Sequence, residues 1–346
     1  MRIMVTGASG FVGSHAVAAL LAAGHRPRVL VRDPGKATKV LGTLGIPADS
    51  VEFVPGDMLD EAAVEEALTG CDAAIHAAAA IGVTGPAGDL VDINVTGTRN
   101  VVGGAAARGL DPIIYISTIG VFVPPDRPVI TADGPLAAPR TGYGRSKVAA
   151  EQYVRELQDG GAPITTIYPG GIGGPDQPVL GELNEGLVGG MSKAWPYPEG
   201  GVAVLDVRDL AVAISRSLTP GQGPRRRVLG GHYLTWAGLM DLCDELTGVP
   251  IRRFKVPGWV MLALGSALDT AKRIKHFDFP LTRDAAEFMI KLVPTDDRPL
   301  LEETGLTLRP ARETLADSLR WLVTAGHLDP ARAGHMSRQI TTGELP

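Results

Sequence analysis

A turn of three evenly spaced glycines near the start of the chain constrains its fold more than any other feature. Gly7, Gly10 and Gly13 follow the apolar run Arg2–Thr6 and open the helical pattern Phe11–Ala23. The first glycine permits a tight turn, the second lets the backbone approach a pyrophosphate, and the third lets the helix pack closely on a sheet. Free N–H groups and the helix dipole would then face anionic phosphates. A turn without a ligand is the alternative, but the strand-to-helix context favours a dinucleotide site.

Short apolar runs alternate with longer segments of helical period through the first two-thirds of the chain. This alternation predicts an α/β fold with a parallel, doubly wound sheet of Rossmann type. Apolar residues fill the strands because helices cover both faces of such a sheet. The predicted strands are Arg2–Thr6, Arg28–Val31, Val51–Val54, Ala73–His76, Pro112–Ser117 and Pro163–Tyr168, and the predicted helices between them are Phe11–Ala23, Glu61–Leu68, Leu90–Arg108 and Tyr143–Gln158.

The second half of the chain is expected to form a smaller, mostly helical region. Glycine and proline cluster after Pro169, and helical patterns dominate from residue 230 to 325. We therefore predict a dinucleotide-binding domain over residues 1–168, to which residues 202–217 return. A substrate-binding region is predicted over residues 169–330, followed by a weakly ordered tail over residues 331–346.

Composition and charge argue against several classes of protein. The chain has 346 residues, of which 45% are hydrophobic and 21% charged, as in ordinary globular domains. A net charge of −5 provides no positive electrostatic field that would attract nucleic acid. The three arginines Arg225–Arg227 are interpreted as a solvated turn. Cys71 and Cys243 share no metal-like spacing with histidines. Buried thiols in a reducing cytoplasm are therefore expected, and no metal site is predicted.

The sequence predicts neither a signal peptide nor a transmembrane segment. The N-terminus begins at once with an apolar strand. The longest apolar stretch, Val256–Leu268, is shorter than the about 20 residues that cross a bilayer. A helix packed within the protein is the favoured interpretation of residues 256–274, and contact with a membrane surface is the alternative.

The end of the second predicted strand bears on the identity of the dinucleotide. NAD-binding proteins usually place an acid here to hold the ribose 2′-hydroxyl. In this chain Val31 occupies the position of that acid. The next residue is Arg32, whose guanidinium suits a 2′-phosphate. NADP is therefore favoured. NAD is the alternative cofactor, because a shift of one residue would put the carboxylate of Asp33 at the ribose.

Tyr143 and Lys147 lie four residues apart at the start of a predicted helix, so they share one face. A free phenol has a pKa near about 10 and is a poor base at neutral pH. A neighbouring ammonium and an oxidised nicotinamide would both lower the pKa of Tyr143 toward the working range. In the reductive direction, the phenol would donate its proton to a carbonyl oxygen. His76, with no potential metal ligands at suitable spacing, is interpreted as a structural histidine.

Taken together, these motifs resemble the extended short-chain dehydrogenase/reductase family over residues 1–330. Besides the glycine turn and the Tyr143–Lys147 pair, the resemblance rests on Asp57, His76-Ala77-Ala78, Asn94-Val95, Gly97-Thr98 and Val207-Arg208-Asp209. It implies that Asp57 contacts the adenine and that Asn94 braces the active site. Thr118 would hydrogen-bond the substrate oxygen, with Ser117 as the neighbouring alternative. The resemblance and the motifs predict Thr118, Tyr143 and Lys147 as catalytic residues, and Gly7, Gly10, Phe11, Val12, Gly13, Arg32, Asp57, Met58, Ala77, Ala78, Ala79, Asn94, Tyr143, Lys147, Pro169 and Ile172 as cofactor-binding residues.

Two segments indicate which branch of this family the chain resembles. Residues 168–175 carry glycines where nucleotide-sugar enzymes usually place an asparagine. Residues 31–34 look like the NADP-type turn of dihydroflavonol-reductase-like members, a branch that also includes 3-beta-hydroxysteroid dehydrogenases. The resemblance therefore implies an oxidoreductase that interconverts an alcohol and a carbonyl on a small or medium apolar substrate.

The sequence also allows two alternative functions and indicates partners of the chain. A nucleotide-sugar epimerase or dehydratase with bound NAD is the alternative enzyme, and a non-catalytic dinucleotide-sensing regulator is a more remote one. Residues 80–90, 122–142 and 176–200 are expected to shape the pocket for the small-molecule substrate. The resemblance also implies a homodimer through the helices near residues 90–108 and 143–158.

Overall fold

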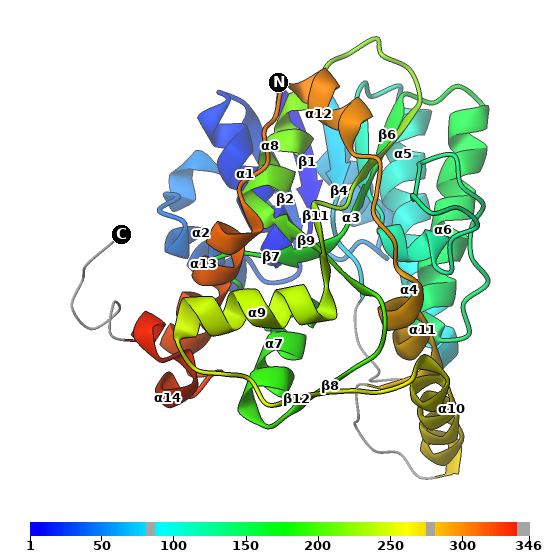
Figure 1. The fold of residues 1–346 in the computed structure, drawn as a ribbon. Coiled ribbons are helices and arrows are strands. Elements are labelled where there is room, and N and C mark those ends of the chain that lie inside the picture. Colours follow the sequence, from blue (N-terminus) through cyan, green and yellow to red (C-terminus); the bar gives the residue numbers. More distant parts are fainter. Residues whose placement is uncertain (81–86, 275–280, 338–346) are drawn as a thin grey trace.

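The computed structural model describes residues 1–80, 87–274 and 281–337. A seven-stranded sheet lies at its centre, in the order β10-β6-β5-β4-β1-β2-β3 with all neighbours parallel (Figure 1). The predicted Rossmann-type α/β fold is therefore confirmed. The strands are β1 (Arg2–Thr6), β2 (Arg26–Val31), β3 (Glu52–Pro55), β4 (Ala73–His76), β5 (Ile113–Ile116), β6 (Ile164–Pro169) and β10 (Arg225–Leu229).

Helices pack on both faces of the sheet, and the alternation of side chains along β1 explains why. Ile3 and Val5 lie in a buried cluster with α1 and α8, whereas Met4 lies in a second cluster with α3 and α6. Successive residues of one strand thus reach opposite faces, and both faces are apolar. These helices are α1 (Phe11–Ala22), α2 (Pro34–Thr43), α3 (Glu61–Leu68), α4 (Ala87–Thr98), α5 (Gly104–Ala107), α6 (Gly142–Asp159), α8 (Val207–Arg216) and α12 (Arg298–Thr304). A π-helical turn over Arg99–Gly103 joins α4 to α5, and short 3-10 turns occupy Ala48–Ser50 and Ile119–Phe122.

Helix α2 is absent from the sequence-based prediction. It begins where the chain leaves β2, with Asp33 as its N-cap and Pro34 in its first turn. The Asp33 carboxylate accepts a hydrogen bond of 3.0 Å from the N–H of Lys36. An aspartate followed by proline is a recognised start of a helix, but the apolar pattern behind it is weak, since only Ala37 and Leu41 are buried.

The prediction of a solvated turn at Arg225–Arg227 is wrong, because these residues form the edge strand β10. β10 pairs in parallel with β6, with Arg225 opposite Thr165. Glu303 of α12 binds both Arg225 and Arg227, the latter at 2.9 Å between Nε and Oε2. This shared carboxylate offsets the repulsion of neighbouring guanidinium groups and lets three arginines occupy a strand.

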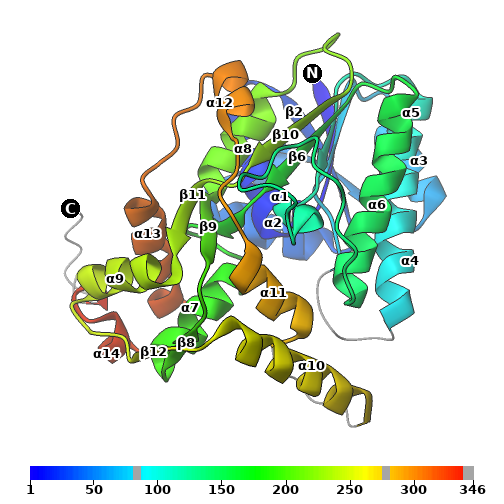
Figure 2. The same cartoon turned by 45° about the vertical axis from the view of Figure 1, so that its right-hand side comes forward.

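The second half of the chain builds a smaller unit below the carboxyl ends of the main strands (Figures 1 and 2). β9 joins a separate three-stranded sheet, β11-β9-β7, while the following helix α8 packs against α1. A third buried cluster holds α7, α9, α13 and α14 together. Its strands are β7 (Gly171–Gly173), β8 (Trp195–Tyr197), β9 (Gly201–Asp206), β11 (His232–Thr235) and β12 (Arg253–Lys255), and its helices are α7 (Glu182–Ser192), α9 (Trp236–Thr247), α10 (Gly258–Ile274), α11 (Arg283–Lys291), α13 (Ala311–Thr324) and α14 (Pro330–Ala333).

The prediction of a weakly ordered tail over residues 331–346 does not hold for residues 331–336. Ala333 and Met336 are buried in the third cluster, and α14 covers the end of α13. Asp329 caps α14 by accepting a hydrogen bond of 2.9 Å from the N–H of Ala331. The remainder of the tail, residues 338–346, lies outside the described residues.

Candidate active site

The glycine turn joins β1 to α1 with backbone contacts that leave no room for side chains. Gly7 has φ of +80°, and a Cβ there would lie 2.8 Å from backbone atoms of Ala77 and Ala78. A Cβ on Gly13 would lie 2.2 Å from the carbonyl oxygen of Gly7. Gly7 therefore lets β1 approach the end of β4, and Gly13 lets the first turn of α1 sit against the loop.

The start of α1 carries N–H groups that are free to bind an anion. The first helical hydrogen bond runs from the N–H of Ser14 to the carbonyl of Gly10, at 3.0 Å. In the part of the chain that the structure describes, the N–H groups of residues 11–13 have no acceptor, and no side chain caps the helix. Gly10 adds no side chain over this end. The geometry suits the phosphates of a dinucleotide.

Arg32 and Asp57 come together beside this turn, at the ends of β2 and β3. The Arg32 side chain is 82% exposed, and its Nη1 lies 3.8 Å from Oδ2 of Asp57. Asp57 also accepts a hydrogen bond of 3.0 Å from the N–H of Leu59. The sulfur of the adjacent Met58 packs over Gly97. Asp33, the alternative ribose partner, is engaged as the cap of α2.

The end of β4 is held to β1 by a buried histidine. Nδ1 of His76 lies 2.8 Å from Oγ1 of Thr6, and its Nε2 lies 3.3 Å from Oγ1 of Thr98. Thr6 in turn accepts a hydrogen bond of 3.2 Å from the N–H of Ala78. Burial lowers the pKa of His76 to about 3, so the ring is neutral near pH 7. His76 is thus a structural histidine, as predicted. The described residues contain no group of three or more His, Cys, Asp or Glu side chains that could hold a metal.

Asn94 connects the segment after β4 to the helix that carries Tyr143. Its Oδ1 accepts a hydrogen bond of 2.7 Å from the N–H of Ala80, and its Nδ2 donates to the carbonyl of Ala80 and to Oγ of Ser146, at 3.2 and 2.9 Å. Ser146 donates to the carbonyl of Tyr143 at 2.7 Å. Sequence reasoning missed Ser146, although its position three residues after Tyr143 places it on the same side of the helix.

Helix α6 is anchored at its N-terminus by groups from two distant parts of the chain. Thr141 caps it by accepting a hydrogen bond of 3.2 Å from the N–H of Gly144. Asp284 of α11 accepts hydrogen bonds from the N–H groups of Arg140 and Thr141, at 2.8 and 2.6 Å. Tyr143 therefore lies in a helical turn that Asp284 of α11 helps to hold in place. No local sequence pattern identifies Asp284, which lies in a different helix.

Tyr143 and Lys147 occupy successive turns of α6. Lys147 is buried and makes no hydrogen bond or ion pair within the described residues. Burial lowers the pKa of its ammonium to about 8, opposed by the nearby carboxylates of Glu182 and Glu151. Desolvation of the phenolate by the surrounding protein raises the pKa of Tyr143, and the negative charge of Glu182 acts in the same direction. The Lys147 ammonium alone therefore does not give Tyr143 the lowered pKa that sequence reasoning expected, because desolvation of the phenolate dominates.

The remaining predicted residues end neighbouring strands at the same edge of the sheet. Thr118 follows β5 and caps a short turn, its Oγ1 accepting a hydrogen bond of 3.1 Å from the N–H of Gly120. Its neighbour Ser117 is buried, whereas Thr118 keeps contact with solvent. Pro169 ends β6, and Ile172 lies in β7 opposite Leu205 of β9. Because parallel strands end at one edge, Thr118 and Pro169 share it with Ala77–Ala79 and the glycine turn, whereas Ile172 lies in the separate three-stranded sheet.

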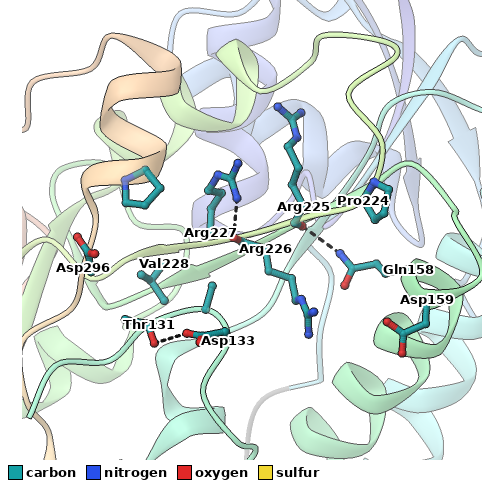
Figure 3. Close-up of a pocket in the computed structure, with 12 residues that line it drawn as sticks. Thr131, Asp133, Gln158, Asp159, Pro224, Arg225, Arg226, Arg227, Val228 and Asp296 are labelled. Carbon is teal, nitrogen blue, oxygen red and sulfur yellow. Dashed lines mark hydrogen bonds between the residues drawn. The ribbon is translucent and has the colours of Figure 1, made fainter. Parts of the chain in front are cut away.

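A surface pocket of about 510 Å³ opens elsewhere, along the outer edge of the sheet (Figure 3). Figure 3 shows Arg226 of β10 pointing between Asp133 and the end of α6 at Gln158 and Asp159. None of the residues predicted for the reaction lines this pocket. It is therefore separate from the candidate active site.

The parallel sheet, the phosphate cradle and the Tyr–Lys helix define a member of the short-chain dehydrogenase/reductases. The chain belongs to the NAD dependent epimerase/dehydratase family, whose profile matches residues 3–226, and it is an enzyme of this extended class. The family depends on a nicotinamide dinucleotide, and the free N–H groups at α1 fit that cofactor.

Individual relatives agree with this assignment. Cinnamoyl-CoA reductase 1 of Petunia hybrida is 30% identical over 94% of this chain and 93% of its own. A putative dihydroflavonol 4-reductase of Synechocystis sp. is 26% identical over 94% of this chain and 95% of its own. The solved structure of gox2253 has a TM-score of 0.78 and 25% identity, covering 95% of this chain and 99% of that one.

The close packing of the glycine turn predicts opposite outcomes for two glycine-to-alanine substitutions. Gly13→Ala places a methyl group against the Gly7 carbonyl and should cost about 1–3 kcal/mol in the free energy of unfolding. It should also abolish stabilisation by NADPH. Gly42→Ala, in the exposed part of α2 with open space around it, should leave both properties intact or raise stability by up to about 1 kcal/mol. Urea denaturation with and without NADPH measures both effects. Native stability and cofactor response in Gly13→Ala would contradict the account.

Proposed function

We propose that this enzyme is an NADPH-preferring oxidoreductase that interconverts an alcohol and a carbonyl on a small or medium apolar substrate. The observation that carries the proposal is the arrangement of Tyr143 and Lys147 on successive turns of α6, with Lys147 buried and unpaired within the described residues. An ammonium without a partner on a largely buried lysine is available to bind an anionic or hydroxyl-bearing ligand. The ribose of the nicotinamide nucleotide is a ligand of this kind.

The chain's own residues account for the movement of the proton. When bound, the dinucleotide supplies or accepts the hydride. In the reductive direction, the Tyr143 phenol donates its proton to the substrate oxygen, and the Thr118 hydroxyl donates a hydrogen bond to the same oxygen. Its raised pKa keeps the Tyr143 phenol protonated at neutral pH, as the donor in the reductive direction must be. Lys147 stabilises the phenolate that remains.

Charge and packing support an apolar substrate over a nucleotide sugar. The carboxylate of Glu182 lies close enough to Tyr143 and Lys147 to affect both of their pKa values. An acid at this place repels a diphosphate. On neighbouring elements, Leu183 packs against Gly171 and Gly173 of β7, and Phe288 of α11 reaches Gly120. The two named relatives are reductases, which supports the same chemistry here.

An epimerase or dehydratase with tightly held NAD is the second candidate, because the family carries these activities in its name. Release of NAD on denaturing the purified protein would favour it. A non-catalytic regulator is disfavoured, since Tyr143 and Lys147 are both present. A homodimer through α4 and α6 and a cytoplasmic location stay predictions.

The preference for NADPH is proposed from the roles of two neighbouring residues. Asp33 is engaged in capping α2, whereas the Arg32 guanidinium is exposed and lies 3.8 Å from Asp57, a long ion pair that leaves it accessible to a 2′-phosphate. Arg32→Ala should therefore raise the Kd of NADPH about tenfold or more and leave that of NADH nearly unchanged. Arg26→Ala, an exposed arginine at the opposite end of β2, is the matched control and should change neither. Isothermal titration measures all four constants. Equal effects of Arg32→Ala on both cofactors would overturn the preference.

Tyr143→Phe tests the proposed proton donor. The substitution removes only the phenol oxygen, so α6 and the cofactor cradle should stay intact. Reduction of a carbonyl substrate should fall about 10²–10⁴-fold, while the thermal shift caused by NADPH is retained. Turnover by Tyr143→Phe at the native rate would remove Tyr143 from the reaction. Loss of the thermal shift would instead point to a structural role.

A further inference from the structure

Helix α10 exposes large apolar side chains that the fold does not cover. Trp259 is 73% exposed and Leu264 is 47% exposed. Phe254, on the preceding strand β12, is 55% exposed. Exposed apolar residues are ordinary when scattered singly, but these three lie within eleven positions of one another on adjoining elements. Together with the exposed Arg252 and Lys255, we call them the α10 surface.

The exposed and buried residues of α10 lie on different sides of the helix. Trp259 and Ala263, four residues apart, are exposed. Met261 and Gly265, also four apart, are buried. A Cβ on Gly265 would lie 2.7 Å from the carbonyl oxygen of Thr282, so this side packs tightly against the start of α11. Apolar side chains therefore lie on the outer side of α10 as well as on the side that packs against α11.

The α10 surface lies along one margin of the molecule. Both views place β8, β12 and α10 at the end farthest from the N-terminus, below the carboxyl ends of the main strands (Figures 1 and 2). The side chains of Arg252 and of nearby Lys193 are exposed and have no carboxylate partner among the described residues. The N–H of Trp195 bonds to the carbonyl of Arg252 at 2.7 Å, so the two cations flank the same end of the paired strands.

We propose that the α10 surface docks on an anionic lipid bilayer, with α10 lying in the plane of the interface. Aromatic and aliphatic side chains on one side of a helix, with cations close by, match the chemistry of this interface. No helix in the described residues is long and apolar enough to span a bilayer, so contact is limited to the surface. Arg252 and Lys193 supply charge complementarity to phosphate headgroups, whereas Lys255 is paired with Glu199 at 3.0 Å.

Hydrogen bonds connect the docking helix to the reaction centre. Nη1 of Arg283 donates to Oγ of Ser266, and the N–H of Arg283 donates to Oδ2 of Asp269, at 2.9 and 3.0 Å. The next residue, Asp284, holds the N-terminus of α6 through Thr141. Docking of α10 therefore brings the catalytic helix close to the bilayer, where apolar molecules accumulate. The docking itself does not depend on the proposed reduction.

Intrinsic fluorescence and vesicle flotation test the proposal on the full chain. Trp195 and Trp236 are buried, so Trp259 is the most exposed tryptophan of the described residues. Vesicles of phosphatidylcholine with phosphatidylglycerol should shift the emission to the blue and float the protein. The double variant Phe254→Ser/Trp259→Ser should float about tenfold less, and added salt should weaken binding of the native chain.

Matched variants separate docking from misfolding and from self-association. Trp259→Phe should keep flotation, and Val129→Ser, which changes an exposed apolar residue in a different loop, should leave it unchanged. NADPH should stabilise every variant as it does the native chain. Native protein that fails to float, or a double variant that floats equally well, would overturn the proposal. A concentration-dependent dimer abolished by the double variant, without flotation, would assign this surface to a second copy instead.

Discussion

The close contact between the glycine turn and the end of β4 is the constraint on which the rest of the structure depends. Gly7 meets the backbone of Ala77 and Ala78, and Gly13 meets Gly7, at distances that exclude any side chain. The Thr6–His76 hydrogen bond beside them fixes the same two strands. This packing leaves the first N–H groups of α1 free. The contacts that hold β1 against β4 therefore also leave these groups available to bind an anion.

A chain of polar contacts transmits this geometry to the catalytic helix. Asn94 joins the backbone after β4 to Ser146, and Ser146 bonds the carbonyl of Tyr143. From the other side, Asp284 holds the start of the same helix. Tyr143 is thus positioned jointly by contacts from the central sheet and from α11.

Sequence reasoning succeeded where a local pattern has one physical meaning. The glycine spacing and the apolar runs predicted the parallel sheet, and the apolar residues Ile3, Met4 and Val5 pack against helices on both of its faces. It failed where distant partners decide the structure. Arg225–Arg227 lies in a strand, where Glu303 of the distant helix α12 pairs with Arg225 and Arg227. The raised pKa of Tyr143 depends on burial and on Glu182, neither of which is visible in its local sequence.

The central claim is that this enzyme transfers a hydride to an external carbonyl while Tyr143 supplies the proton. Reaction of the purified protein with NADPH that carries deuterium at both C4 positions of the nicotinamide, and with an apolar ketone, tests the hydride transfer most directly, with mass spectrometry of the product. The account predicts one deuterium on the carbinol carbon of the alcohol, together with stoichiometric oxidation of the cofactor. An alcohol without deuterium, or protein that carries tightly bound NAD and only epimerises a nucleotide sugar, would contradict it.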